Sequence, residues 1–527
     1  MSARGIAVVG RVCLVLVAGG CLSADLTAPD LPAMTALPPA PAAASQPAQP
    51  QLSVAVVSLR QCLEWALANN LRLSVERLTP SLRDAQIVEA LSAFDAVFGN
   101  TYSYGSLRQE SGQSPFLAPP VDRSQTWAVD WNVQKRLLTG AQAKIAFGWD
   151  HQETNNPFVT PDPRQDATLS AGVTQPLLRD FGRDVNTAAI RVARNTKYGS
   201  DYQFRKTVED TLQGVEETYW LLYAAIEQLK VRKRQLDRAK DLLDRAKKLV
   251  AAGKSARVDE TAAQAEVARV AGTIVQAENT VRRAEDAIKR QINHPLLPLG
   301  ARTRVIPADG PGDAPLAVDV DKAVAEALTK RPDLKAAEFE QASADIRVKV
   351  AQNQLLPRLD LGLSHVLHGL DRNTSGALED LVDGQFADKQ VSLTLQIPLG
   401  NRAAKSRLNQ ARIGREQVVR SIGDLRQQIV GEVVRILDDA GSDHAQITAA
   451  REATRLAQER LADEEALYRN ERSTRTDVLQ AQTDVAEREL DEIRAIISYN
   501  INISRFYRLE GAYLEQNRIV IENVAGN

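Results

Sequence analysis

A regular apolar pattern runs through residues 208–250 and sets the length of what this chain can fold into. Apolar or aromatic residues recur there at alternating steps of four and three, with lysine at some of the seam positions. They are Val208, Leu212, Val215, Tyr219, Leu222, Ile226, Leu229, Leu236, Leu243 and Val250. An average step of about 3.5 residues is the repeat of a left-handed coiled coil. If the helix begins near Asn186, it has about 65 residues and is roughly 100 Å long at about 1.5 Å per residue.

A short break and a second helical pattern follow this long helix. The break is Ala252–Ser255, and the second pattern runs from Arg257 to Asn293. Together they predict an antiparallel helical hairpin with its tip near Gly253. A plain coiled-coil spacer would have the same pattern, so the rest of the chain has to decide between the two.

The N-terminus has the features of a secretory signal. Two arginines precede an apolar run that ends in Gly19, Gly20 and Cys21. Small residues before a cysteine resemble a bacterial lipoprotein cleavage box, so we expect residues 1–21 to be a signal peptide and Cys21 to be lipidated. The alternative is an ordinary signal peptidase cut nearby. Residues 22–57 are dense in Pro and Ala, which predicts an extended leader.

Composition and motifs exclude several classes of function. The net charge of −2 over 527 residues gives no reason to expect a nucleic-acid partner. We find no nucleophile elbow, phosphate-binding loop, zinc spacing or paired metal-ligand motif in the sequence, and the five histidines are scattered. The sequence therefore predicts neither an enzyme nor a bound metal or cofactor.

The chain contains the same pattern twice. Residues 58–98 align without a gap with residues 319–359, and Leu249–Val267 align with Leu467–Val485 around two hairpin tips. Tandem copies of one supersecondary unit predict internal pseudosymmetry. The expected parts are a first repeat 58–293, a Pro- and Gly-rich connector 294–318, a second repeat 319–514 and a C-terminal tail 515–527.

Short segments in which apolar and polar residues alternate lie between the helices of each copy. They are 127–136, 143–150 and 169–174 in the first copy, with a fourth candidate before them, and 359–364 and 391–397 in the second. A soluble half-buried sheet would alternate in the same way. We expect barrel strands instead, because about 8 to 10 residues nearly span a tilted barrel wall and aromatic residues gather near the strand ends. The aromatic girdle candidates are Tyr102, Tyr104, Trp127 and Trp149.

From about Ser58 to Leu514 the chain resembles the TolC family of outer-membrane efflux proteins. The matching signatures are the paired helix openings at 58–67 and 320–328, the strand exits Gln175–Gly182 and Ile397–Arg402, and the second tip Ser473–Gln482. The resemblance implies an α+β membrane protein with two structural repeats in each chain. In it, three chains share one transmembrane β-barrel, which long antiparallel helices continue as a coiled-coil tunnel across the periplasm.

The resemblance also implies a function and partners. The chain would be the outer-membrane duct of a tripartite efflux or type I secretion system, and would extend into the periplasm. A periplasmic adaptor would connect this homotrimer to an inner-membrane pump, which chooses the exported substrate. The alternative is a periplasmic coiled-coil adaptor or scaffold, which normally has one hairpin flanked by compact β domains.

Two sets of site residues follow from the resemblance. Asp477 matches the first of two carboxylates that form a ring at the closed periplasmic end of family members, and Gln480 occupies the position of the second. Such a ring favours cations, whereas the alternative is a solvated helix-terminal Asp that offsets the helix dipole. Both tip turns are expected to bind the adaptor through Gly253, Lys254, Ser255, Arg257, Glu471, Arg472, Ser473 and Arg475.

Two departures from the family stay open at this point. The family usually contributes two strands per copy, and the extra hairpin Trp127–Asp150 either enlarges the barrel or stands outside it. At the second tip, Glu471 occupies the position of Gly253, which leaves the geometry of that turn undecided.

Overall fold

The computed structural model describes residues 54–110, 121–253, 255–301, 303–470 and 472–520. The expected signal peptide with Cys21, most of the leader, Lys254 and Glu471 lie outside these residues. The described chain divides into two units. The β unit comprises residues 94–186 and 357–398, and the helical unit comprises 54–93, 187–356 and 399–520.

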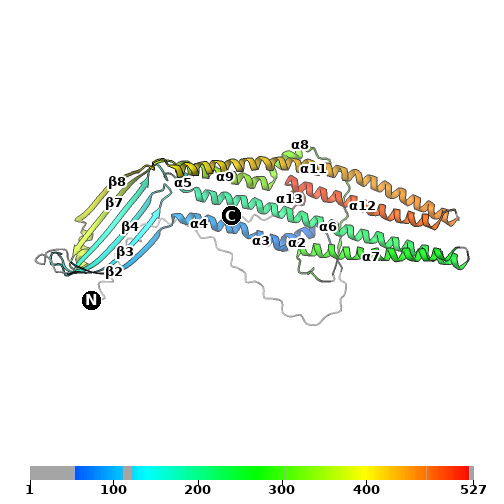
Figure 1. Cartoon of the computed structure of the whole chain (residues 1–527), viewed down its shortest axis with the longest axis horizontal. Helices are drawn as coiled ribbons and strands as arrows, with labels where there is room; N and C mark the ends of the chain where they lie inside the picture. The colour runs from blue at the N-terminus through cyan, green and yellow to red at the C-terminus, as the bar shows by residue number, and fades with distance from the viewer. Residues whose placement is uncertain (1–53, 111–120, 254, 302, 471, 521–527) are drawn as a thin grey trace, which may run out of the picture. The chain divides into compact units, whose positions relative to one another are not determined.

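In the described part of the chain, the β unit contains one antiparallel sheet of six strands in the order β2-β3-β4-β5-β7-β8 (Figure 1). The strands are β2 (Val97–Glu110), β3 (Val121–Arg136), β4 (Gln142–Thr154), β5 (Arg164–Pro176), β7 (Arg358–Asp371) and β8 (Phe386–Gln396). The expected extra hairpin forms β3 and β4 in the interior of this sheet, so it is not a surface excursion.

The strands are longer than expected. They contain 11 to 16 residues, because the backbone ladder continues through polar residues beyond the apolar alternation. The girdle candidates therefore lie inside the strands and not at their ends. In β2, for example, the ladder runs past Tyr104 to Glu110.

The two faces of the sheet differ in chemistry. Residues that oppose one another across the ladders share a face, and one face, here called the apolar face, collects large apolar side chains from each of the six strands. Its members include Phe98, Tyr102, Tyr104, Trp127, Val129, Trp131, Ile145, Phe147, Trp149, Leu169, Val173, Leu361, Leu367, Val391 and Leu393. The opposite, polar face includes Ser103, Asp130, Asn132, Lys144, Ser170, Thr174, Ser364, Ser392 and Thr394.

Helix α10 (Thr374–Asp383) connects β7 to β8 and packs on the apolar face. Its buried residues Ala377 and Leu381 contact Ala167 of β5. A side chain at Gly369 of β7 would place its Cβ 1.8 Å from the Ala377 carbonyl oxygen, so only glycine allows this close approach. The sequence analysis did not predict this helix. The short helix α5 (Arg183–Asn186) follows β5 in the chain.

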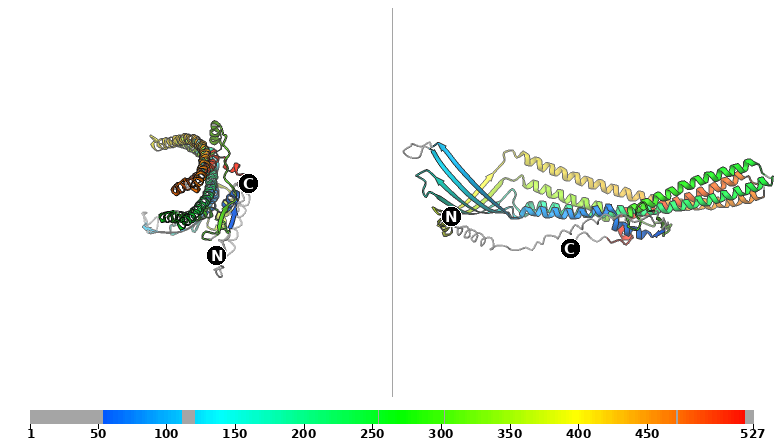
Figure 2. Two further views of the ribbon diagram at one scale, coloured as in Figure 1. Left: turned by 90° about the vertical axis from the view of Figure 1, so that its right-hand side faces the viewer. Right: turned by 90° about the horizontal axis from the view of Figure 1, so that it is seen from below.

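Two long helical hairpins form most of the helical unit (Figures 1 and 2). The first consists of α6 (Ala188–Ala251) and α7 (Arg257–Ile292), and the second of α11 (Arg402–Arg469) and α12 (Arg475–Glu510). Helix α6 has 64 residues and α7 has 36, which confirms the predicted hairpin. No helix in the described ranges combines the length and apolarity needed to cross a membrane.

Shorter helices open each repeat and confirm the internal duplication. They are α2 (Leu59–Asn69), α3 (Leu71–Glu76) and α4 (Leu78–Leu91) in the first repeat, followed by a 3-10 turn at Ser92–Phe94, and α8 (Val320–Lys330) and α9 (Pro332–Asn353) in the second. Ser58 starts α2 with a capping box, and the Asp319 carboxylate caps α8. The next helix of each repeat begins at matching positions, with Leu71 after the N-cap Asn70 and with Pro332 after Arg331.

The buried seam of α6 changes phase along the helix. The predicted residues from Val208 to Leu229 are buried, except for Ile226, which is partly buried. Beyond them the buried positions are Val231, Gln235, Ala239, Leu242 and Ala246 rather than the predicted Leu236, Leu243 and Val250. In this part of α6, Val231 packs against Ala486 and Leu490 of α12, which also packs against the earlier part of α6 through Ile497 and Ile501.

The leader and the connector are joined by a small sheet that the sequence analysis missed. Strand β1 (Val54–Val57) pairs in parallel with β6 (Arg304–Pro307). The end of the predicted leader is therefore not solvated chain, since Val57 is buried in the core. Asp309 stabilises this junction by accepting hydrogen bonds from the Leu59 amide at 2.6 Å and the Tyr219 hydroxyl at 3.1 Å. The predicted C-terminal tail begins at residue 515, which lies inside a short helix, α13 (Tyr513–Gln516).

Candidate functional site

The two hairpin tips of the helical unit are held together by one arginine. Arg475, the first residue of α12, forms an ion pair with Asp259 of α7 at 3.0 Å and also donates to the Asp259 backbone carbonyl. The Ser255 hydroxyl donates to the same carboxylate at 2.5 Å. These hydrogen bonds, that of Ser255 foremost, lower the pKa of Asp259. Arg475 is thus a connection between the two tips and not a freely exposed docking residue.

A groove of about 850 Å³ lies between the tips. Four basic side chains line it, together with the Asp259 carboxylate and the ring of Tyr468. The basic residues are Arg245, Lys248, Arg469 and Arg475. Sequence analysis named only the last of them, because the others lie on the helices before the turns and are recognisable only once the hairpins are placed side by side. The groove is suited to an acidic partner surface.

The predicted docking residues take different positions around this groove. Gly253 forms the first turn with φ +71°, which explains the glycine there, and Arg257 is exposed beside it. At the second tip Arg472 is exposed, whereas the Ser473 hydroxyl donates to Glu464 at 2.6 Å. The exposed apolar side chain of Val258, which sequence reasoning missed, lies next to Arg257 and is 75% exposed.

Asp477 and Gln480 lie on one exposed side of α12, opposite the buried residues Val478 and Ala481. Thr474 is the N-cap of this helix, and its hydroxyl lies 2.6 Å from the Asp477 carboxylate, which also accepts from the Thr474 amide at 3.2 Å. Hydrogen bonding to Thr474 lowers the pKa of Asp477. Within one chain, Asp477 therefore closes a capping box, and its exposed side remains available to line an aperture.

The four girdle candidates gather on the apolar face of the sheet. Tyr104 and Trp127 oppose each other on β2 and β3, with ring centroids 5.3 Å apart. Trp127 in turn lies 5.1 Å from the ring of His151. On β2, the residues of this face beyond Tyr104 are polar, so the aromatic cluster marks the border between the apolar band and the polar strand ends.

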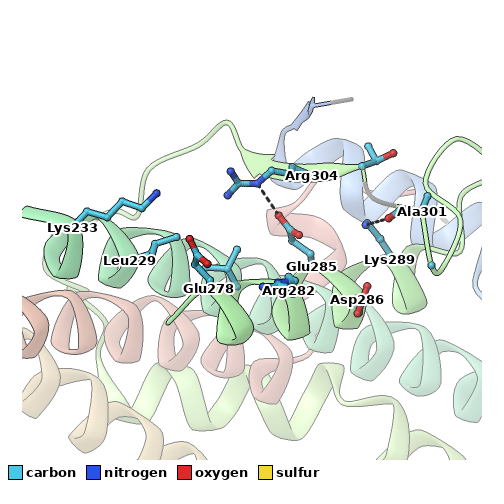
Figure 3. A pocket seen from close by; sticks show the side chains of 12 residues that line it. Leu229, Lys233, Glu278, Arg282, Glu285, Asp286, Lys289, Ala301 and Arg304 are labelled. Carbon is cyan, nitrogen blue, oxygen red and sulfur yellow. Dashed lines mark hydrogen bonds and ion pairs between the residues drawn. The ribbon is translucent and has the colours of Figure 1, made fainter. Parts of the chain in front are cut away.

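A second cavity of about 680 Å³ lies between the first hairpin and the connector (Figure 3). Lys289, which is 3% exposed, donates from Nζ to the carbonyl oxygen of Ala301 at 3.0 Å. The Glu285 carboxylate lies 3.7 Å from the guanidinium of Arg304. These charges are partnered by the protein itself and tie the connector to α7. Over the described ranges, no cluster of three or more His, Cys, Asp or Glu side chains is placed to hold a metal ion.

We compared the chain with protein-family models, curated sequences and solved structures. The model of a family described as outer membrane efflux protein matches residues 63–294 and 323–512. No curated protein sequence was matched. Among solved structures, the chain is similar to CusC, with a TM-score of 0.64 and 15% identity over 89% of this chain and 99% of that one. It is also similar to the CmeC outer membrane channel of Campylobacter jejuni, with a TM-score of 0.62 and 16% identity over 86% of each chain.

A third similar structure is the open state of the MtrE outer membrane channel of Neisseria gonorrhoeae. Its TM-score is 0.59, at 17% identity over 89% of this chain and 98% of that one. Identities this low show a common fold. The similar structures agree with the expected fold class, in which barrel strands and long helical hairpins occur in two repeats of one chain.

The family match covers both repeats, including both hairpins and most of the strands between them. This excludes the alternative of an adaptor with one hairpin between compact β domains. The expected location in the outer membrane with extension into the periplasm, and the expected function as an efflux duct, agree with this match and with the channel structures. The chain belongs to the outer membrane efflux protein family.

Proposed function

We propose that this outer-membrane duct is a homotrimer that receives its substrates from an inner-membrane pump through a periplasmic adaptor. The long helices of the helical unit form a curved layer that is open on one side (Figure 2). Such a layer encloses a tunnel only when further copies complete it. Passive passage through a tunnel needs no catalytic group or cofactor, so we assign the protein neither.

The observation that carries the adaptor proposal is the basic groove between the two tips. Exposed residues close in sequence to its lining residues are Arg257 and Val258 on α7, before Asp259, and Arg472, before Ser473. An adaptor hairpin that presents carboxylates and an apolar anchor would match this surface. Three chains would offer three such grooves, together with the surfaces between neighbouring chains.

At the same end of the hairpins, we assign Asp477 and Gln480 to the aperture of the tunnel. Both side chains are exposed on one side of α12, close to the tip. Three copies of Asp477 around an axis would attract cations and repel one another. The ion pair between Arg475 and Asp259 holds the start of α12 against the first hairpin, and we assign to it the role of keeping that aperture narrow.

Crosslinking in cells tests the docking proposal. A photoreactive residue at Val258 should capture a periplasmic protein with an adaptor signal and hairpin, and Arg257→Glu should reduce that capture several-fold. Arg290→Glu is the matched control, because Arg290 is an equally exposed cation at the other end of α7. Equal capture by both variants would contradict docking at this tip. A protein band that shifts from trimer to monomer on boiling tests the homotrimer separately.

A further inference from the structure

The described sheet of the β unit has two open edges. Strand β2 pairs only with β3, and β8 pairs only with β7, within the residues that the structure describes. The backbone groups on the outer side of each edge strand therefore have no ladder partner among the described residues. An open edge of this length on a soluble protein is a template for association.

The apolar face continues onto both edge strands. On β2 it presents Phe98 and Tyr102, and on β8 it presents Val391 and Leu395, all at least 59% exposed. These strands therefore lie in the same hydrocarbon layer as the rest of the sheet. In that layer no water is present to pair with a free backbone N–H or C=O group, so both edges need a partner.

The strand directions show which partner fits. The sheet is antiparallel throughout, so β2 and β8, at opposite edges of an even number of strands, run in opposite directions. The outer edge of β8 can therefore form an antiparallel ladder with the outer edge of β2 of a second copy. Repetition of this one contact by rotation closes a ring.

We propose that three copies close a barrel of eighteen strands, in which β8 of each chain pairs with β2 of the next and the β3–β4 hairpin is part of the wall. The number follows from six described strands in each chain and rests on the proposed homotrimer. The hairpin belongs to the wall because both of its strands are paired on both sides and carry the apolar face. A barrel that lacked this hairpin would need β2 to pair directly with β5.

A barrel of this size encloses a water-filled lumen and not a packed core. Its inner surface would be the polar face, with residues such as Asp130, Lys144, Ser170 and Thr394. The barrel would therefore pass hydrated solutes without a strong constriction. Selection among solutes would then depend on the helical aperture at Asp477.

The register of the seam follows from two constraints. At the strand ends that connect in sequence to the helices, the ladders are nearly flush, with Arg358 opposite Gln396 and Val97 opposite Gln134. Apolar side chains must also stay on one face across the seam. Both constraints are met when Leu395 faces Phe98 and Val391 faces Tyr102 of the next chain, and a register shift by two residues preserves the face as well.

Paired cysteines test the seam. Opposed residues in an antiparallel ladder have Cβ atoms about 4.5–5.5 Å apart, near enough for a disulfide after small adjustment. Oxidation of membranes that contain Val391→Cys with Tyr102→Cys should give covalent dimers and trimers that survive boiling and disappear on reduction. The matched control, Val391→Cys with Phe98→Cys, moves one cysteine about 13 Å along the strand at roughly 3.3 Å per residue and should give none.

The scan includes Lys389→Cys and Leu393→Cys against Tyr102→Cys, so a register shifted by two residues in either direction is also detected. Crosslinks between chains at one of these same-face positions support the seam. Their complete absence, in variants that still show the boiling-sensitive trimer band, overturns the seam but leaves the homotrimer intact. Loss of the trimer band in the parent protein would instead overturn the proposed assembly itself.

A second pair of variants tests the number of strands. Tyr102→Cys with Val129→Cys should form a disulfide within one chain, because these residues oppose each other on β2 and β3. Tyr102→Cys with Leu169→Cys joins β2 to β5 and should not react. A disulfide between positions 102 and 169 would show that β2 and β5 are neighbours, which reduces the barrel to twelve strands and overturns the proposal.

Discussion

At the scale of single residues, Asp477 is subject to two opposite electrostatic influences. Hydrogen bonds from the N-cap Thr474 lower the pKa of Asp477 below its ordinary value. Its ionised form therefore stabilises the start of α12 above about pH 3.9, and this contribution is lost as the pH falls further. Three converging carboxylates in the proposed trimer would raise the apparent pKa instead and titrate as a coupled set.

The Asp477→Asn variant separates the aperture role from the capping role. Asn can still accept the hydrogen bond from the Thr474 amide, so α12 and trimer assembly should be unchanged. In single-channel recordings, cation preference and block by multivalent cations should fall several-fold, because the ring loses its charge. Gln480→Glu, which adds a carboxylate on the same side of the helix, should increase both. Unchanged block in both variants would assign Asp477 to helix capping alone.

Arg475 joins the start of α12 to Asp259 of the first hairpin. Arg475→Ala removes the ion pair and the backbone hydrogen bond to Asp259, so the second tip should separate more easily from the first and the channel conductance should rise. Arg472→Ala is the control, because Arg472 is an exposed cation three residues earlier. Exchange of the charges, Arg475→Asp with Asp259→Arg, should restore part of the low conductance. A conductance equal to the parent value in Arg475→Ala would show that this contact does not restrain the aperture.

At the scale of elements, the packing of α10 on the sheet depends on one glycine. In Gly369→Ala the new Cβ would overlap the backbone of Ala377, and α10 would have to move away from β7. Overpacking of this kind costs about 1–3 kcal/mol, so the dissociation temperature of the trimer and the protease resistance of residues 372–385 should both fall. Gly105→Ala is the matched control, since its added Cβ has open space around it. Equal protease resistance in the two variants would contradict the observed packing.

The sequence contains enough information for the long helices but not for all of their contacts. Steps of four and three predict the long helix α6, because a coiled-coil seam repeats along the sequence, and Gly253 indicates its turn. The buried positions beyond Leu229 could not be predicted, since they depend on contacts with helices far along the chain, such as that of Val231 with α12. Helix α10 was missed because its apolar residues are few and match the apolar face only in three dimensions.

For the strands too, the sequence predicted what depends on local pattern and missed what depends on distant partners. Alternation located the apolar core of each strand, but the ladders extend further because a paired neighbour, and not the side-chain pattern, determines where pairing ends. At the tips, the sequence indicated the turns through Gly253 and the aligned Asp477. The groove residues Arg245 and Lys248 were missed, because they lie on α6 and meet the second hairpin only in the folded chain.

At the scale of the whole molecule, the expected lipidation of Cys21 would add a second means of membrane attachment to the barrel. A barrel is permanently inserted in the membrane, so the formed barrel needs no further anchor. Lipidation of Cys21 would therefore contribute little to anchoring in the mature trimer. It would matter before insertion, when the chain has to reach the outer membrane with its apolar face still uncovered.

Metabolic labelling with a radioactive fatty acid tests whether Cys21 is lipidated. The parent chain should carry the label, and Cys21→Ser should lose it, because Cys21 follows the small residues Gly19 and Gly20 at the end of the signal. Trimers of the variant that do form should keep their boiling-sensitive band, since the strands are unchanged, but they should accumulate more slowly in the outer membrane. Cys62→Ser is the control for labelling, because Cys62 is buried in the helical core. Equal labelling of Cys21→Ser and the parent would remove the lipoprotein assignment, and a parent chain without label would favour an ordinary signal peptidase cut.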